Sequence, residues 1–89
     1  MTTQTIINAI NQEMAAEKIE MVKRGWETTK SILDNPVYSV TYFVAKCELL
    51  YDMAITLNGA NDEQEKEIKA LRREILHTCE DETGHDLRA

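Results

Sequence analysis

The sequence predicts an all-α fold of three helices, in which a third helix docks on a long antiparallel helical hairpin. Breakers are rare, with one proline and three glycines in 89 residues, and this favours long helices over many short strands. Apolar residues recur at steps of three and four along three segments. Hydrophobic residues make up 43% and charged residues 29% of the chain, a composition typical of a folded domain. The length predicts one domain, residues 1–89.

The first helix is expected over residues 3–33. Its apolar face is wide and covers nearly half of the helical wheel. Glu13, Glu20 and Glu27 recur every seven residues on the opposite side. Gly25 lies inside the helix beside Trp26, where glycine costs about 1 kcal/mol relative to alanine. It marks either a kink or a place where another helix comes close.

The second helix is expected over residues 36–58. Pro36 suits a first helical position, with Asn35 as the cap. The helix has a heptad-like apolar seam with alternating steps of three and four, formed by Val40, Phe43, Cys47, Leu50, Ala54 and Leu57. The pair Asn58-Gly59 should end it, because both residue types tolerate left-handed geometry.

The third helix is expected over residues 62–80. Asn61 with Gln64 three residues later predicts a capping box at its start. Its apolar stripe is narrow, which predicts a single contact face against the first two helices. The polar residues 81–89 are expected to fray.

The predicted helices differ in length, and this mismatch leaves part of the first helix uncovered. At about 1.5 Å per residue the first helix is the longest by roughly 10 Å. Its amino-terminal half, with Ile6, Ile7, Ile10 and Met14, therefore keeps an apolar face beyond the hairpin. That half is either unstable or buried against a second copy or another protein. Lys18 lies near the middle of the apolar stripe, where it either extends to water or pairs with an acid of a partner chain.

A second, weaker apolar strip lies on the second helix around Lys46. It consists of Tyr38, Tyr42, Leu49 and Met53. Exposed aromatic and methionine side chains are common anchors of protein interfaces. The alternative is that a neighbouring helix covers this strip as core.

Charge and cysteine content exclude several classes of function. The net charge is −6, with nine acids against five bases from Asp62 onward, so direct nucleic-acid binding is not expected. No secretory segment is expected, because residues 1–5 lack a basic start and an apolar run of signal length. No membrane-spanning segment is expected either, because Lys46, Glu48 and Asp52 interrupt the longest apolar stretch. Cys47 and Cys79 have no paired spacing. A reduced cytoplasmic protein is the expectation.

No residue pattern indicates a catalytic or metal site. His77, Cys79 and His85 fall within nine residues, but side chains two positions apart on a helix diverge by about 200°. No Cys or Ser has a local His and acid to activate it. We therefore expect no enzyme activity, no cofactor and no bound metal.

These observations favour a non-enzymatic protein-binding module, such as a small inhibitor or adaptor of the kind that phages encode. Its expected partner-binding residues are Ile7, Ile10, Met14, Lys18, Tyr38, Tyr42, Leu49 and Met53. The partner is another protein or the chain itself, as a homodimer or higher oligomer. Two alternatives stay open. One is an oligomer that binds a small anion or nucleotide between chains. The other is an acidic mimic of nucleic acid that blocks a DNA-binding protein.

Overall fold

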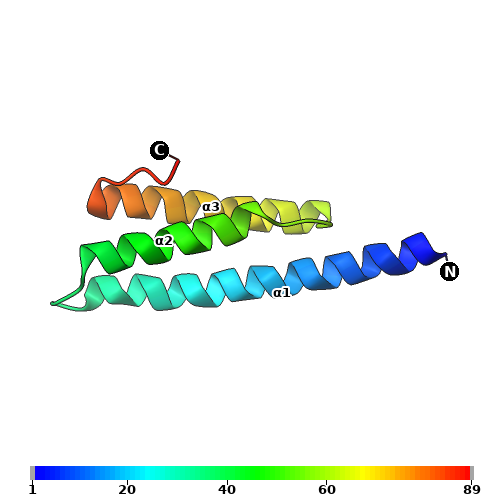
Figure 1. Cartoon of the computed structure of the whole chain (residues 1–89), viewed down its shortest axis with the longest axis horizontal. Coiled ribbons are helices and arrows are strands. Elements are labelled where there is room, and N and C mark those ends of the chain that lie inside the picture. Colours follow the sequence, from blue (N-terminus) through cyan, green and yellow to red (C-terminus); the bar gives the residue numbers. More distant parts are fainter. Residues whose placement is uncertain (1, 89) are drawn as a thin grey trace.

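The computed structural model describes residues 2–88 and contains three helices in an antiparallel arrangement (Figure 1). They are α1 (Thr3–Ser31), α2 (Val40–Ile55) and α3 (Asp62–Thr83), with a short 3-10 helix, η1 (Ile32–Asp34), after α1. Each helix contacts the other two. The predicted all-α class, with a helical hairpin and a third docked helix, is confirmed. The outer residues Met1 and Ala89 of the predicted single domain lie outside the described part.

Helix α1 begins where a threonine cap satisfies its first turn. Thr2 is extended, and its hydroxyl accepts a hydrogen bond from the Thr5 amide at 3.2 Å. The α-helical geometry ends at Ser31, two residues before the predicted end, and the last turn tightens into η1. Asn35 then turns extended, with φ −83° and ψ 123°, because the residue before a proline avoids helical geometry.

Helix α2 is shorter than predicted at both ends. It begins at Val40 rather than Pro36, because Ser39 caps it and accepts a hydrogen bond from the Tyr42 amide at 3.2 Å. Asn35 does not cap a helix at Pro36, since its side-chain oxygen accepts from the Val37 amide at 3.0 Å in a local turn. Helix α2 ends at Ile55 rather than Asn58, with Thr56 as its C-cap.

Helix α3 starts as predicted and ends later than predicted. Asn61 and Gln64 form the reciprocal capping box, with both hydrogen bonds at 2.9 Å. The helix continues to Thr83, where Gly84 ends it in left-handed geometry at φ 75°. Residues 81–83 of the tail that was expected to fray therefore belong to the helix, and Leu87 packs back on the core. His85 also contacts Glu48 of α2 at 3.1 Å.

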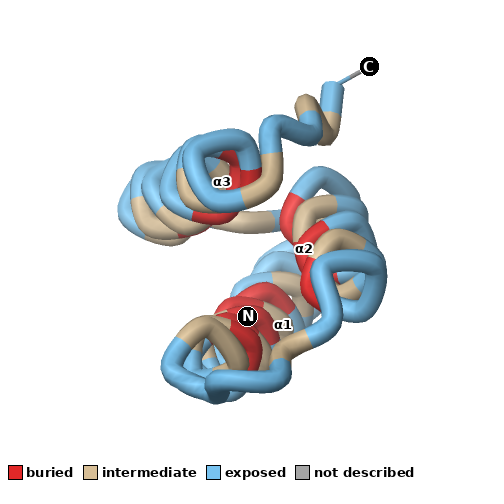
Figure 2. Tube along the Cα trace, turned by 90° about the vertical axis from the view of Figure 1, so that its left-hand side faces the viewer, coloured by how far each residue is buried: buried red, intermediate tan, exposed pale blue. Residues whose placement is uncertain are grey.

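The core lies between the inward faces of the three helices, which Figure 2 shows nearly end-on. Its largest fully buried side chains are Trp26, Phe43, Ile68 and Ile75. Of the two roles predicted for Gly25, a kink or a close approach of another helix, the structure shows the close approach. A Cβ at residue 25 would lie 2.7 Å from Leu50 Cδ2 of α2. Within the described residues, no helix has the length and hydrophobicity needed to cross a lipid bilayer.

Candidate protein-binding surface

The first turns of α1 project beyond the rest of the molecule (Figure 1). The molecule measures 55 × 23 × 17 Å, and the long dimension follows α1. Near the amino-terminal end of the contact between α3 and α1, the Gln12 carbonyl accepts a hydrogen bond from Gln64 Nε2 at 2.8 Å. Gly59, in the loop between α2 and α3, packs directly against Asn11. Residues 3–10 lie past both contacts, and we call this segment the overhang.

The overhang is exposed and uncharged, and four of its eight residues are apolar. Ile6, Ile7 and Ile10 are 46%, 43% and 48% exposed. No residue from Thr2 to Gln12 carries a charge, although 29% of the whole chain is charged. Exposed apolar residues are ordinary when scattered singly. These three isoleucines lie within five consecutive helical residues and have no charge between them. They form a continuous apolar surface, which is typical of an interaction site.

A hollow of about 180 Å³ lies at the foot of the overhang. It is lined by Asn11, Met14, Ala15, Lys18, Leu57 and Asn58. Met14, one of the predicted partner-binding residues, is 61% exposed at its edge. The hollow therefore extends the exposed surface of the overhang toward the end of α2.

Lys18 has a partner within the chain. Its ammonium donates to the Thr56 carbonyl oxygen at 3.0 Å and to the Thr56 hydroxyl at 2.7 Å. Thr56 ends α2, so the positive charge lies at the negative end of that helix dipole. Neither predicted alternative, extension to water or pairing with a partner's acid, describes this contact. Lys18 instead joins α1 to the end of α2.

The strip predicted on α2 is only partly exposed. Tyr42 and Leu49 are 52% and 57% exposed. Tyr38 stacks edge-on against Phe43 with ring centroids 6.2 Å apart, and Met53 packs against the core. The structure thus divides the strip into two outward and two half-buried side chains. The strip runs along the side of α2, whereas the overhang projects past its end.

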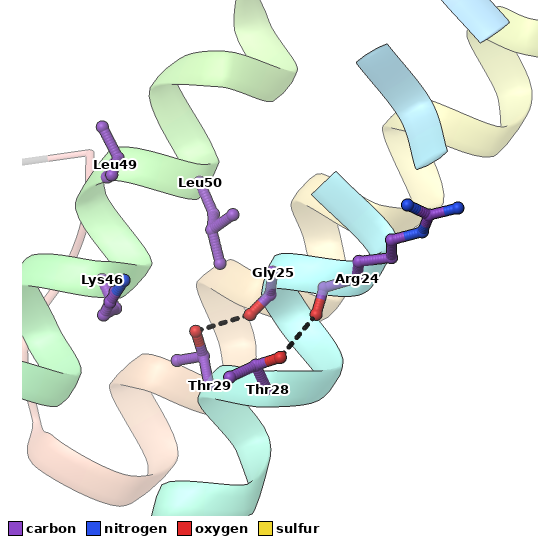
Figure 3. Close-up of a pocket in the computed structure, with 7 residues that line it drawn as sticks. All are labelled: Arg24, Gly25, Thr28, Thr29, Lys46, Leu49 and Leu50. Atoms are coloured by element: carbon purple, nitrogen blue, oxygen red, sulfur yellow. Dashed lines mark hydrogen bonds between the residues drawn. The ribbon is translucent and has the colours of Figure 1, made fainter. Parts of the chain in front are cut away.

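A groove of about 300 Å³ runs beside this strip between α1 and α2 (Figure 3). It is lined by Arg24, Gly25, Thr28, Thr29, Lys46, Leu49 and Leu50. The two hydroxyls bond back to their own helix, Thr28 to the Arg24 carbonyl and Thr29 to the Gly25 carbonyl. The Arg24 side chain extends away from the groove in Figure 3, and Lys46 lies over the Tyr42 ring at 5.6 Å. The groove therefore has no pair of cations aimed at one point.

Two basic residues on α1, Lys23 and Lys30, pair with acids of α3 as well as with acids of their own helix. Lys23 forms an ion pair with Glu67, and this hydrogen bond raises the pKa of the Lys23 ammonium. Lys30 lies 3.1 Å from Glu27 and 3.9 Å from Glu74. Glu74 also accepts a hydrogen bond from the Trp26 indole. The pairs between α1 and α3 depend on how the two helices pack, so the spacing of charges along the sequence does not reveal them.

The three residues considered as metal ligands, His77, Cys79 and His85, lie in separate environments. His77 is exposed, whereas Cys79 is buried and its sulfur lies 3.7 Å from the Thr83 hydroxyl. His85 contacts Glu48 instead. Across residues 2–88, no three His, Cys, Asp or Glu side chains converge on one point.

Comparison with known proteins adds no relative: no family model, no curated protein and no solved structure matches this chain.

Proposed function

We propose that this chain is a non-enzymatic protein-binding module that associates through the overhang. The observation that carries the proposal is the exposure of Ile6, Ile7 and Ile10 on a segment without charge. Complete burial of one such side chain contributes about 1.5–3 kcal/mol, and each of these is a little under half exposed. Covering the overhang therefore yields a useful part of a binding free energy. A module of this kind acts as an inhibitor or an adaptor by occupying a surface of another protein.

Paired substitutions at opposite ends of the molecule test this proposal. The variant Ile7→Gln/Ile10→Gln removes apolar surface from the overhang. The control Val37→Gln/Val40→Gln changes two residues that are 86% and 50% exposed near the start of α2. Both variants keep the net charge of the chain. Tagged forms of the chain and of both variants are used to capture proteins from a lysate of the cells that make it, at low and high salt.

We expect the native chain and the Val37/Val40 control to capture a stoichiometric protein that the overhang variant loses. The capture should survive high salt, because screening weakens charge interactions and leaves apolar contacts. A protein that both variants retain and that high salt releases would contradict the proposal. That result would instead support the acidic-mimic alternative, in which the carboxylates of α3 make the contact.

A further inference from the structure

We propose that the overhang binds a second copy of this chain, with the two α1 helices paired antiparallel. This inference rests on the proposed function and names its partner. Three features of the described residues favour a second copy: the distribution of charge, the spacing of the exposed side chains, and the hollow at the foot of the overhang.

Charge favours self-association at this end of the molecule and at no other place along α1. Two copies that each carry a net charge of −6 repel one another. The overhang is uncharged, so two overhangs in contact bring no like charges together. An antiparallel pair also points the two bodies in opposite directions, which keeps the acidic α3 helices apart. At physiological salt the remaining repulsion is screened beyond about 8 Å.

The exposed residues have the spacing of a short helix-pairing seam. Thr3, Ile7, Ile10 and Met14 follow steps of four, three and four, and all four are exposed. Such a seam lets the side chains of one helix pack into the spaces of another. With the twofold axis between residues 8 and 9, Ile7 of each copy faces Ile10 of the other. Thr3 of each copy then faces Met14 of the other, which gives four layers.

At each end of the seam, the hollow and Glu17 of one copy lie next to the start of α1 of the other copy. In this register the start of the partner's α1 lies over Met14, where the 180 Å³ hollow provides space. Glu17 lies one turn further along the same face, is exposed, and makes no ion pair among residues 2–88. It would face the amino-terminal, positive end of the partner's α1, and that first turn contains no acid of its own.

The interface is small, so the dimer should be weak and depend on concentration. Four layers bury less surface than the roughly 1,200–2,000 Å² of a stable complex. We therefore expect monomer at about 1 μM and a growing dimer fraction toward 1 mM. Sedimentation equilibrium across this range measures the dissociation constant. The Ile7→Gln/Ile10→Gln variant should remain monomeric, whereas Val37→Gln/Val40→Gln should dimerise like the native chain.

Two further measurements test the geometry. Glu17→Lys should weaken the dimer about two- to fivefold more than Glu17→Gln, because the new charge opposes the helix dipole. A spin label on the variant Ser31→Cys shows whether the two α1 helices are parallel or antiparallel. The label attaches to the new cysteine alone, because the native Cys47 and Cys79 are buried. The antiparallel register separates the two labels by about 70 Å at 1.5 Å per residue. A parallel pair would bring them within about 20 Å, because packed helix axes lie about 8–10 Å apart.

The outcomes separate this inference from the proposed function. A native chain that remains monomeric at 1 mM, or labels within about 20 Å, would overturn the antiparallel dimer. The proposed function would survive that result if the overhang variant still lost a captured protein. If both variants fold with the thermal midpoint of the native chain, loss of the dimer reports the interface rather than misfolding.

Discussion

Burial makes the thiol of Cys47 unreactive. Its thiol is fully buried between α2 and α3. Burial, together with the neighbouring Cys79 thiol, raises its pKa from 9.0 to about 12. The thiolate is the reactive form of cysteine. The folded protein therefore holds Cys47 as an unreactive thiol at neutral pH.

This predicts that a disulfide reagent at pH 8 modifies neither cysteine of the folded chain within minutes, and modifies both after unfolding. The absorbance of the released thiol measures the reaction. The pKa shift also determines whether the stability of the fold rises or falls with pH. Between pH 9 and about 12 the unfolded thiol loses its proton while the folded thiol keeps it, so stability falls as pH rises through this range. Rapid modification of the folded chain would contradict the buried arrangement.

Two glycines adopt left-handed geometry, and only one of them is also crowded. Gly59 has φ 72° and Gly84 has φ 75°. A Cβ on Gly59 would collide with the Cβ of Asn11, whereas a Cβ on Gly84 would meet nothing within 4 Å. The loop between α2 and α3 thus depends on the absence of a side chain at residue 59, and the foot of the overhang depends on that loop.

We expect Gly84→Ala to cost about 1–2 kcal/mol, the strain of left-handed geometry alone. Gly59→Ala should cost about 1–3 kcal/mol more, because the helix and the loop must also move apart. Urea unfolding of both variants, followed by the fluorescence of Trp26, measures the difference. Equal losses would show that the loop and α1 do not touch as described.

At the scale of elements, the contact between Lys18 and Thr56 joins α1 to the end of α2. The lysine ammonium binds the carbonyl and the hydroxyl at the end of α2. The hydroxyl also lies 3.3 Å from the Asp52 and Met53 carbonyls of the last turn. These bonds satisfy the end of α2 at residue 56, so the helix does not need to continue to Asn58.

Removal of the lysine should therefore destabilise the fold, although the residue lies at the edge of the core. We expect Lys18→Ala to cost about 1 kcal/mol through the lost charge-assisted hydrogen bonds. Lys69→Ala serves as control, because Lys69 is exposed on α3 and forms no ion pair within the described residues. That control should change stability by less than about 0.5 kcal/mol. If Lys18→Ala and Lys69→Ala lowered the free energy of unfolding equally in chemical denaturation, Lys18 would not stabilise the end of α2.

The elements themselves could be predicted because their signals are local. The apolar periodicity identified all three helices, and the Asn61–Gln64 capping box fixed the start of α3. The ends of α2 could not be read in the same way. Ser39 and Thr56 are weaker local signals than Pro36 and Asn58-Gly59. At the carboxyl-terminal end of α2, Thr56 is bound by Lys18, which lies 38 residues away along the chain.

At the scale of the whole molecule, the exposed amino-terminal face of α1 was predictable from length alone. A helix of 29 residues cannot be covered by partners of 16 and 22 residues. The roles of Lys18, Tyr38 and Met53 were not predictable, since each depends on which helix lies beside it. Whether any of the eight predicted residues binds a partner stays a prediction.

Amide hydrogen exchange of α1 shows whether the overhang is the surface that a partner covers. The chain alone at about 1 μM is compared with the chain in the complex it forms, either with itself near 1 mM or with a captured protein. Exchange at residues 3–14 should slow strongly in the complex, while α2 and α3 change little, because a covered helix opens less often. Unchanged exchange at residues 3–14, with protection on α3 instead, would contradict the assignment of the overhang as the binding surface.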